Sequence, residues 1–274
     1  MKYEKLKNMK DKKFKRTVGI PRELFELLAE ILLLAFNTKH SKGGRKPKLS
    51  VEDILIMYLK YYRDYPTFDS LGFQFGIDES NAYRWVKWCE DVLSDIFKSM
   101  IKELTDMSKI NISNEHIVDV TECSIQRPKV DEIQREYYSG KKKKHTIKIQ
   151  IIMDEKTKQI IRVAFDKGSV HDFSLFKKTV GELDKLMAWI ADSGYQGIEK
   201  IFKNAITPKK RSKNNPLTDE DKELNKLISN KRIPIEHINC QVKIFRILSE
   251  RYRSRRETFC LRALIICCFY NLCT

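Results

Sequence analysis

The sequence lacks any apolar run long enough to cross a membrane. Its longest, Ala263 to Tyr270 with Leu261 and Leu272 beside it, is far shorter than the roughly 18 residues that a membrane-spanning helix needs. It therefore indicates a buried helix. No apolar signal core directly follows the lysine-rich N-terminus, so export is not expected. We predict a cytoplasmic protein with no membrane partner.

Cysteine and histidine are arranged in ways that exclude several kinds of site. The 7 cysteines form no C-x-x-C pair, which argues against a zinc site and a disulfide framework and favours reduced thiols in the core. Only 5 histidines are present. The adjacent His171 and Asp172 therefore do not indicate an HD-type phosphohydrolase, which needs further histidine ligands on helices.

Positive charge is what the chain has in excess. It contains 53 Lys and Arg against 37 Asp and Glu, a net charge of +16. An imbalance of this size is typical of proteins with a polyanionic partner, and nucleic acid is a better candidate than a membrane surface. A chain of 274 residues, 42% of them apolar, suits one catalytic domain with a small helical one.

The N-terminal part of the chain is expected to be helical. Residues 1–20 are rich in lysine and predict a flexible basic arm that meets an acidic partner, with a solvated tail as the alternative. From Pro21 apolar residues recur with helical period, and a basic linker containing glycine and proline covers 37–49. Residues 21–104 are therefore predicted to form a small all-α domain.

A helix-turn-helix is indicated within this domain. Ser50 is a good N-cap for a first helix, and a short helix over 67–75, a turn at Gly76 and a long helix capped by Asp78 or Ser80 follow. This is the helix-turn-helix order. Four residues at the start and on the outer face of the long helix would then contact DNA: Asn81, Tyr83, Arg84 and Lys87. A plain three-helix bundle packed on the catalytic domain explains the same apolar stripes.

After a linker around 105–115 the pattern changes to strands. Strand-like segments lie at 116–125, 145–153, 159–165, 186–191 and 205–207. Helical segments lie at 172–183, 218–230, 235–248 and 259–272. Residues 114–274 are therefore predicted to form an α/β catalytic domain, a mixed sheet flanked by helices.

Three carboxylates stand where a nuclease needs them. Asp119 lies inside the first strand, Asp192 ends another strand, and Glu236 lies in a helix. Phosphodiester chemistry uses two cations roughly 3.5–4 Å apart, and Mg²⁺ takes only a few protein carboxylates beside substrate phosphate. Without cations such carboxylates would repel one another and one would tend to hold a proton. The pattern predicts a metal-dependent site in which Asp119 bridges both ions.

An isolated Asp at a strand end is more often a cap or turn former than a metal ligand. The flanking residues therefore decide whether these acids are read as metal ligands. In the string ADSGYQG, Gly194 and Gly197 allow a close backbone turn beside a ligand. In the helix, Arg232 precedes Glu236 by one turn and Lys243 follows it by two, all on one face. Such a face would present to DNA a metal ligand flanked by cations.

These segments resemble the DDE transposases of the bacterial insertion-sequence-five type and their Harbinger-like eukaryotic relatives. The strings that carry the resemblance run in the family's order from about Leu49 to the C-terminus: IVDVTE, RPK, YYSGKKKKHTIKIQ, GSVHDFSLF, ADSGYQGI and RIPIEH. The resemblance implies an RNase H-like fold preceded by a helix-turn-helix. It also implies that Asp119, Asp192 and Glu236 bind two divalent ions, Mg²⁺ or Mn²⁺ in its place.

The chain departs from the family pattern at one position. Members often carry a tyrosine three residues before the arginine of the last motif, and Ser229 stands there in this sequence. The departure affects DNA-end handling at that position and leaves the three acids of the metal site in place.

Other residues are expected to support the site. Lys141, Lys142, Lys143 and Lys144 precede a strand and could hold phosphates close to Asp119, with a solvated hairpin tip as the alternative. Asp172, after His171, is expected to cap the following helix or to support the site. His237, next to Glu236, could orient a phosphate or simply pack.

The sequence therefore predicts a transposase. It would bind the inverted ends of its own mobile element in double-stranded DNA, hydrolyse a phosphodiester, and use the freed 3′-hydroxyl to attack target DNA. The family's task implies a homodimer or higher assembly on DNA at the bacterial nucleoid. Two alternatives remain. The three acids argue against a catalytically inactive, transposon-derived DNA-binding protein, and the helix-turn-helix argues against a structure-selective RNase H-like nuclease.

Overall fold

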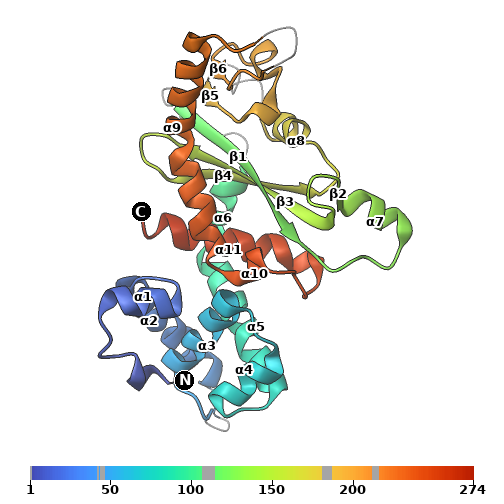
Figure 1. The fold of residues 1–274 in the computed structure, drawn as a ribbon. Coiled ribbons are helices and arrows are strands. Elements are labelled where there is room, and N and C mark those ends of the chain that lie inside the picture. The colour runs from blue at the N-terminus through green and yellow to red at the C-terminus, as the bar shows by residue number, and fades with distance from the viewer. Residues whose placement is uncertain (1, 42, 44–46, 107–114, 181–186, 212–215) are drawn as a thin grey trace. The chain divides into compact units, whose positions relative to one another are not determined.

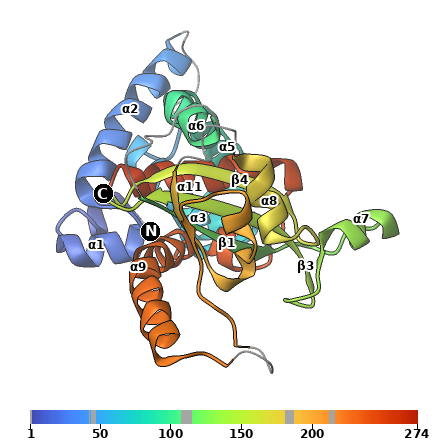
Figure 2. The ribbon, with the colours of Figure 1, turned by 90° about the horizontal axis from the view of Figure 1, so that it is seen from above.

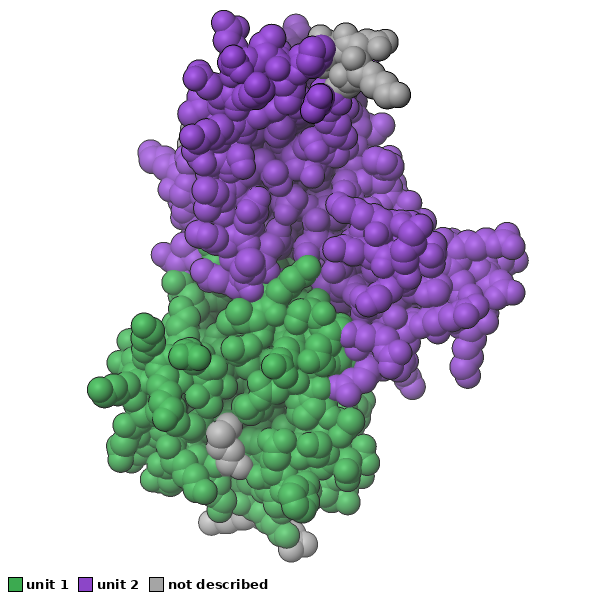
Figure 3. Space-filling view, viewed as in Figure 1, with its two compact units in different colours: residues 1–99, 243–250, 261–273 green, residues 100–242, 251–260, 274 purple. Residues whose placement is uncertain are grey.

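The computed structural model describes residues 2–41, 43, 47–106, 115–180, 187–211 and 216–274. The chain folds into two compact units. Unit 1 comprises Met1–Ser99, Lys243–Glu250 and Leu261–Cys273, and unit 2 comprises Met100–Val242, Arg251–Cys260 and Thr274 (Figure 3). None of the helices among the described residues is both long enough and apolar enough to span a membrane.

Unit 1 is helical (Figure 1). Its elements are η1 (Tyr3–Lys5), α1 (Asp11–Val18), α2 (Arg22–His40), α3 (Val51–Asp64), α4 (Phe68–Phe75), α5 (Glu79–Ile96), the start of α6 (Lys98–Thr105), α10 (Arg246–Ser249) and most of α11 (Phe259–Asn271). At the centre lies α3, most of whose residues are buried. It contacts α1, α2, α4 and α5. The predicted N-cap is confirmed, because the Ser50 hydroxyl accepts a hydrogen bond from the Asp53 amide at 3.2 Å.

The predicted helix-turn-helix is confirmed in α4 and α5. Gly76 ends α4 in the left-handed conformation, with φ 70°, where a glycine avoids the strain of a side chain. Asp78 caps α5 by accepting from the Ser80 amide at 2.8 Å. The turn and the start of α5 lie close against α4, since a Cβ on Gly72 would be 2.7 Å from the Ile77 carbonyl oxygen and 3.2 Å from the Glu79 amide nitrogen.

The N-terminal segment differs from the predicted flexible arm. Residues 11–18 form α1, and Leu6, Phe14 and Val18 are buried. Phe14 and Val18 are four residues apart, which places them on one face of a helix with the lysines on the other. The dense basic composition of residues 1–20 concealed this short apolar stripe.

A buried ion pair attaches the last helix to unit 1. Glu90 of α5 is 1% exposed and Arg262 of α11 is 6% exposed. The Glu90 carboxylate accepts from Arg262 Nε at 2.5 Å and from the Tyr62 hydroxyl at 3.0 Å. The predicted catalytic domain ran to residue 274, whereas residues 261–273 pack in unit 1.

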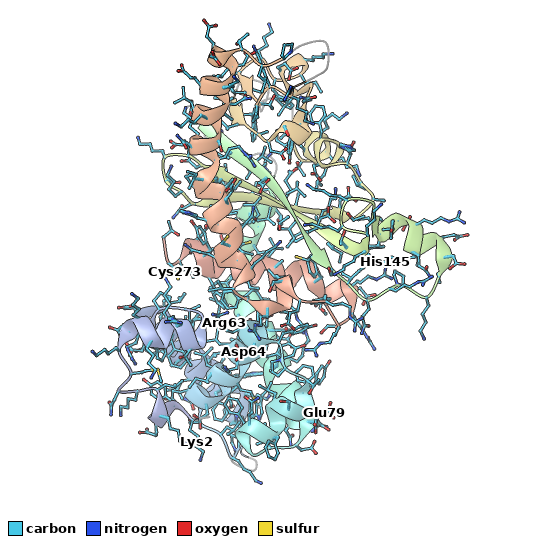
Figure 4. All side chains as sticks on the ribbon, in the orientation of Figure 1. Lys2, Arg63, Asp64, Glu79, His145 and Cys273 are labelled. Atoms are coloured by element: carbon cyan, nitrogen blue, oxygen red, sulfur yellow. The ribbon has the colours of Figure 1, made fainter. Side chains whose placement is uncertain are left out.

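The segment 243–250 is attached to unit 1 by contacts at the end of α3. Arg63, labelled in Figure 4, donates to the main-chain carbonyl of Ile244. The Phe245 ring lies so close to Gly19 that a Cβ there would be 2.9 Å from it. Gly19 also has φ 104°, so glycine is required for both its conformation and its contact.

The Glu90 ion pair gives a first prediction. Glu90→Gln should lower the free energy of unfolding of unit 1 by about 3 kcal/mol, because it removes the buried carboxylate that balances Arg262. Asp91→Asn is the matched control. Its carboxylate pairs with Lys87 on the helix surface, where side chains are 60% and 42% exposed, and about 0.5 kcal/mol or less is expected there. Urea unfolding followed by circular dichroism measures both, and equal losses would contradict the assignment.

Unit 2 contains the sheet. Its strands are β1 (Glu115–Ser124), β2 (Tyr138–Ser139), β3 (Lys144–Asp154), β4 (Ile160–Lys167), β5 (Ala188–Ile190) and β6 (Ala205–Ile206). Its helices are α7 (Asp131–Tyr137), α8 (Asp172–Thr179), η3 (Ser193–Tyr195), η4 (Ile198–Lys200), α9 (Asp219–Lys243) and η5 (Arg256–Thr258), with the greater part of α6.

The sheet is mixed, as predicted. Its main path runs β4, β3, β1, β5, β6, and β2 pairs with the start of β3. β3 is antiparallel to both β1 and β4, while β1, β5 and β6 are parallel. An antiparallel hairpin beside parallel strands is the mixed arrangement expected for an RNase H-like sheet.

Two helices cover opposite faces of the sheet (Figure 2). Val118 and Ile152, which are register partners, pack on one face in a buried cluster with Phe176 of α8 and Trp189 of β5. Successive residues of a strand point to opposite faces, so Asp119 points to the other face. That face is covered by α9, which donates hydrogen bonds to the Asp119 carboxylate.

The structure corrects the prediction of two separate helices over 218–230 and 235–248. One helix, α9, continues through Pro234 and ends at Lys243. Proline removes a main-chain donor and usually breaks a helix at a cost of about 3 kcal/mol. Here Ile228, Ile235, Ile238 and Val242 are buried, and their burial favours the continuous helix.

The remaining differences from the predicted elements are smaller. The predicted helix over 172–183 ends at Thr179, and positions 181–183 lie outside the described residues. α7 and the two-residue strand β2 were not predicted. Each is too short for periodicity to reveal it.

Candidate active site

Strand register brings Asp119 and Asp192 together. β5 is parallel to β1, with Glu115 opposite Ala188 and Ile117 opposite Ile190, a constant offset of 190 − 117 = 73 residues. Continuing this offset beyond the end of β5 places residue 119 + 73 = 192 level with Asp119. The chain therefore leaves β5 beside the acid of β1.

The Asp119 carboxylate is bound by two side chains of α9. Asn239 Nδ2 donates to Oδ2 at 2.7 Å, and Arg232 Nη2 lies 3.5 Å from Oδ1. The side chains of Asp119 and Arg232 are only 21% and 15% exposed. Both oxygens of this acid are therefore engaged inside the protein.

The charge on Asp119 is disfavoured by its surroundings. Burial raises the pKa of this carboxyl from its ordinary 3.8 to about 6. The Arg232 guanidinium lowers the pKa, while the negative charges of Asp192 and Glu236 raise it further. Asp192 and Glu236 are thus close enough to repel the Asp119 carboxylate, which is a situation that a bound cation relieves.

Asp192 is fixed by the turn that follows it. Its Oδ1 accepts a hydrogen bond from the Gly194 amide at 2.7 Å, which caps η3. A Cβ on Gly194 would lie 2.9 Å from this oxygen, so the turn suits glycine. Gly197, with φ 90°, lies in the left-handed region that favours glycine.

The donor chemistry of the site fits a hard divalent ion. Carboxylate oxygens are the ligands that Mg²⁺ prefers, and the mostly buried Asp119, whose pKa Asp192 and Glu236 raise, has Arg232 as its cationic partner among the described residues. Among the described residues no three His, Cys, Asp or Glu side chains stand close enough to hold one ion as they are oriented. Glu236 is exposed, so its side chain has room to turn toward the other two acids.

The predicted phosphate-binding lysines lie at a hairpin tip. Lys141 to Lys144 are all exposed, between β2 and His145 of β3, which is labelled in Figure 4. Lys243 forms the last turn of α9. Contact of these lysines with DNA stays a prediction.

A cavity of about 300 Å³ gathers several of the predicted supporting residues. Its lining includes Lys141, His171, Asp172 and Gly194. Asp172 does not cap α8 with its side chain. Its Oδ1 instead accepts from Lys148 Nζ at 2.6 Å, in a pair whose side chains are 24% and 8% exposed. His237 is exposed on α9 beside Glu236.

The predicted DNA-contacting residues of α5 lie at its surface. Asn81, Tyr83 and Arg84 are exposed. Arg84 Nη1 donates to Asn81 Oδ1 at 3.4 Å. Lys87 pairs with Asp91 one turn further along at 2.8 Å.

Sequence reasoning missed two residues of the site. Asn239 follows Arg232 by seven residues, two helical turns, so helical periodicity could have found it. Tyr195 is 1% exposed, and its hydroxyl has no hydrogen-bond partner among the described residues. Burial raises its pKa well above 10, as do the charges of Asp172, Asp119 and Asp192, and its ring packs against Phe176 in the buried cluster on the α8 face of the sheet. No periodic signal marks this residue.

The mixed sheet, with α8 and α9 covering it, is the α/β architecture of an RNase H-like domain. Residues 118–271 match the family described as DDE superfamily endonuclease, and residues 47–99 match the helix-turn-helix of DDE superfamily endonuclease. The chain belongs to this family of DNA-cleaving DDE transposases, and α4 and α5 form its DNA-binding helix-turn-helix.

A curated relative covers almost the whole chain. It is the probable transposase for insertion sequence element IS702 from Microchaete diplosiphon, 40% identical over 272 residues, which are 99% of this chain and 98% of the relative. The prediction of a DDE transposase is confirmed. The narrower assignment to the insertion-sequence-five and Harbinger-like type stays a prediction.

The raised pKa of Asp119 gives a second prediction. Because the folded pKa of about 6 exceeds the ordinary 3.8, the metal-free protein should lose stability as pH rises through this range, by about 3 kcal/mol. Asp119→Asn removes this cost. It should stabilise the metal-free protein by up to about 3 kcal/mol near pH 8, and the gain should vanish near pH 4.

Unfolding in urea with EDTA at both pH values measures this difference. Asp219→Asn, at a side chain that is 95% exposed, serves as the control and should change stability little at either pH. A gain for Asp119→Asn that is equally large near pH 4 would show that charge burial is not its cause.

Proposed function

We propose that this protein moves an insertion element by binding its inverted terminal repeats, cleaving a DNA strand at each end and joining the ends to target DNA. The observation that carries the proposal is the buried Asp119, repelled by Asp192 and Glu236 and bound by two side chains of α9. The family membership supports the DNA-cleaving chemistry.

Each acid has a part in this proposal. Asp119, Asp192 and Glu236 would together hold the divalent ions. Two Mg²⁺ ions, or Mn²⁺ in their place, would activate the attacking oxygen and stabilise the leaving oxygen. Asn239 keeps the Asp119 carboxylate oriented, and the lysines at the hairpin tip hold phosphates of the strand.

Both steps are in-line displacements at phosphorus. In cleavage, the oxygen of water bonds to the phosphorus and the P–O3′ bond breaks, which leaves a 3′-hydroxyl on the element end and a 5′-phosphate on the flanking strand. In transfer, that 3′-hydroxyl attacks a target phosphorus and the P–O3′ bond of the target breaks. Two ends must be processed together, so we propose that a dimer or higher assembly forms on DNA.

The role of Asp192 is tested with a DNA duplex that carries one inverted terminal repeat of the element. Asp192→Asn should lower strand cleavage in Mg²⁺ by at least about 1,000-fold, because a metal ligand is lost. Its affinity for the same duplex in EDTA should stay within about twofold of wild type, since the basic surface is unchanged. Nicking on sequencing gels and fluorescence anisotropy measure the two quantities.

Glu199→Gln is the matched control, an exposed acid seven residues further along the same segment, and it should cleave normally. Retention of most cleavage by Asp192→Asn would remove Asp192 from the site. A wild-type protein that binds the duplex but never nicks it would instead indicate a DNA-binding protein. Equal cutting of unrelated duplexes would indicate a structure-selective nuclease.

The helix-turn-helix gives a further prediction. Arg84→Gln should weaken binding to the repeat duplex several-fold at about 100 mM salt and reduce the slope of log K against log salt by about 0.9, the loss of one phosphate contact. Lys12→Gln removes an exposed charge from α1 instead and should leave both values near wild type. An unchanged slope for Arg84→Gln would exclude this side chain from phosphate contact.

A further inference from the structure

Arg232 uses little of its hydrogen-bonding capacity. A guanidinium carries five N–H donors in a planar fork. Among the described residues its one hydrogen bond is the long contact to Asp119, at 3.5 Å, and its buried Nε has no partner. The side chain as a whole is only 15% exposed, and Nε is the donor that is both buried and unpaired. An arginine with unpaired donors gains hydrogen-bonding free energy when it moves to an acceptor that takes more of them.

The contact of Arg232 also conflicts with the proposed metal site. Asp119 is the acid proposed to bridge the ions, and the guanidinium lies 3.5 Å from its Oδ1. A divalent cation on this carboxylate would repel a positive charge beside the same oxygen. The ion and the guanidinium therefore compete for Asp119.

We propose that Arg232 exchanges partners during the reaction. In the metal-free protein its guanidinium balances the charge of Asp119. Once divalent cations bind, it is released and donates to a phosphate oxygen of the bound DNA strand. The exchange presupposes the metal site of the proposed function and makes Arg232 a link between metal binding and DNA binding.

The chemistry of Arg232 and its place on α9 support this exchange. Its planar fork matches a phosphate with two parallel hydrogen bonds, a stronger arrangement than one long contact to a carboxylate. It lies one turn before Glu236, so a released guanidinium stays on the face of α9 that carries the site.

Asn239 is the contrasting neighbour. It donates to the other oxygen of Asp119 at 2.7 Å, and it is neutral, so a cation on the carboxylate does not repel it. It can keep Asp119 in position before and after metal binding. Of these two side chains, Arg232 is the one that must move, because it carries a charge of the same sign as the ion.

The test begins with metal binding in the absence of DNA. Full-length protein is titrated with Mn²⁺, and free Mn²⁺ is followed by its paramagnetic resonance signal. Arg232→Gln should bind Mn²⁺ at least about fivefold more tightly than wild type, because the competing charge is gone. Asp119→Asn should lose this site, which shows that the Mn²⁺ measured is the ion in question.

Lys231→Gln is the matched control. This neighbouring residue on α9 pairs with Glu115 at 2.6 Å and is 49% exposed, so the same charge is removed outside the site. Its Mn²⁺ affinity should stay within about twofold of wild type. Arg232→Lys keeps the charge and should also stay near wild type, and it serves as the second variant if Arg232→Gln folds poorly.

A DNA arm tests the release of the guanidinium. Binding of a mixed-sequence duplex of about 30 base pairs is measured by anisotropy in EDTA and in Ca²⁺, an ion that also takes oxygen ligands. In EDTA, Arg232→Gln and wild type should differ by less than about twofold, because Arg232 is occupied by Asp119. In Ca²⁺, the gain in affinity should be at least about threefold smaller for Arg232→Gln and for Arg232→Lys, which lacks the fork.

The outcomes separate this exchange from the proposed function. If wild type binds Mn²⁺ at a site that depends on Asp119 but Arg232→Gln binds it no more tightly, the exchange is excluded and the metal site stands. If wild type has no such Mn²⁺ site, the proposed metal site itself fails. If Arg232→Gln weakens duplex binding equally in EDTA and in Ca²⁺, Arg232 contacts DNA without changing partners.

Discussion

Burial of the Asp119 carboxylate beside two further acids is the constraint on which unit 2 depends. An ionised group in this position is costly, and its pKa of about 6 records the cost. The protein offsets part of it with Arg232 and Asn239, both supplied by α9. The position of α9 on the sheet is therefore tied to the acid that it covers.

Unit 1 also buries a carboxylate, but there the charge is fully paired. Glu90 is almost fully buried, but Arg262 and the Tyr62 hydroxyl satisfy it with short hydrogen bonds. This carboxylate is a structural group that ties α11 to α5 and α3. Asp119 has a weaker cationic partner at 3.5 Å and two repelling neighbours. The difference in how well each acid is satisfied separates a structural carboxylate from one suited to bind a cation.

Much of the fold could be predicted because its signals are local. Ser50 and Asp78 cap helices at the positions that their side chains predict, and Gly76 makes the predicted turn. The strands β1, β3 and β4 lie where the apolar pattern predicts strands. Prediction failed where packing outweighed a local rule. Pro234 lies inside α9, and Phe14 and Val18 bury a helix in a lysine-rich segment.

The sequence by itself determined the residue types of the site and the shared helical face of Glu236 and Asn239, because helical period is a property of spacing along the chain, whereas only the structure showed that the helix continues through Pro234 to include Arg232. It also determined the positive charge suited to DNA. Only the tertiary structure decided that Asp192 lies level with Asp119, since this depends on the register of β5 against β1. It alone decided that Arg232 points to Asp119 and that residues 261–273 pack in unit 1, because both depend on contacts between segments more than 100 residues apart.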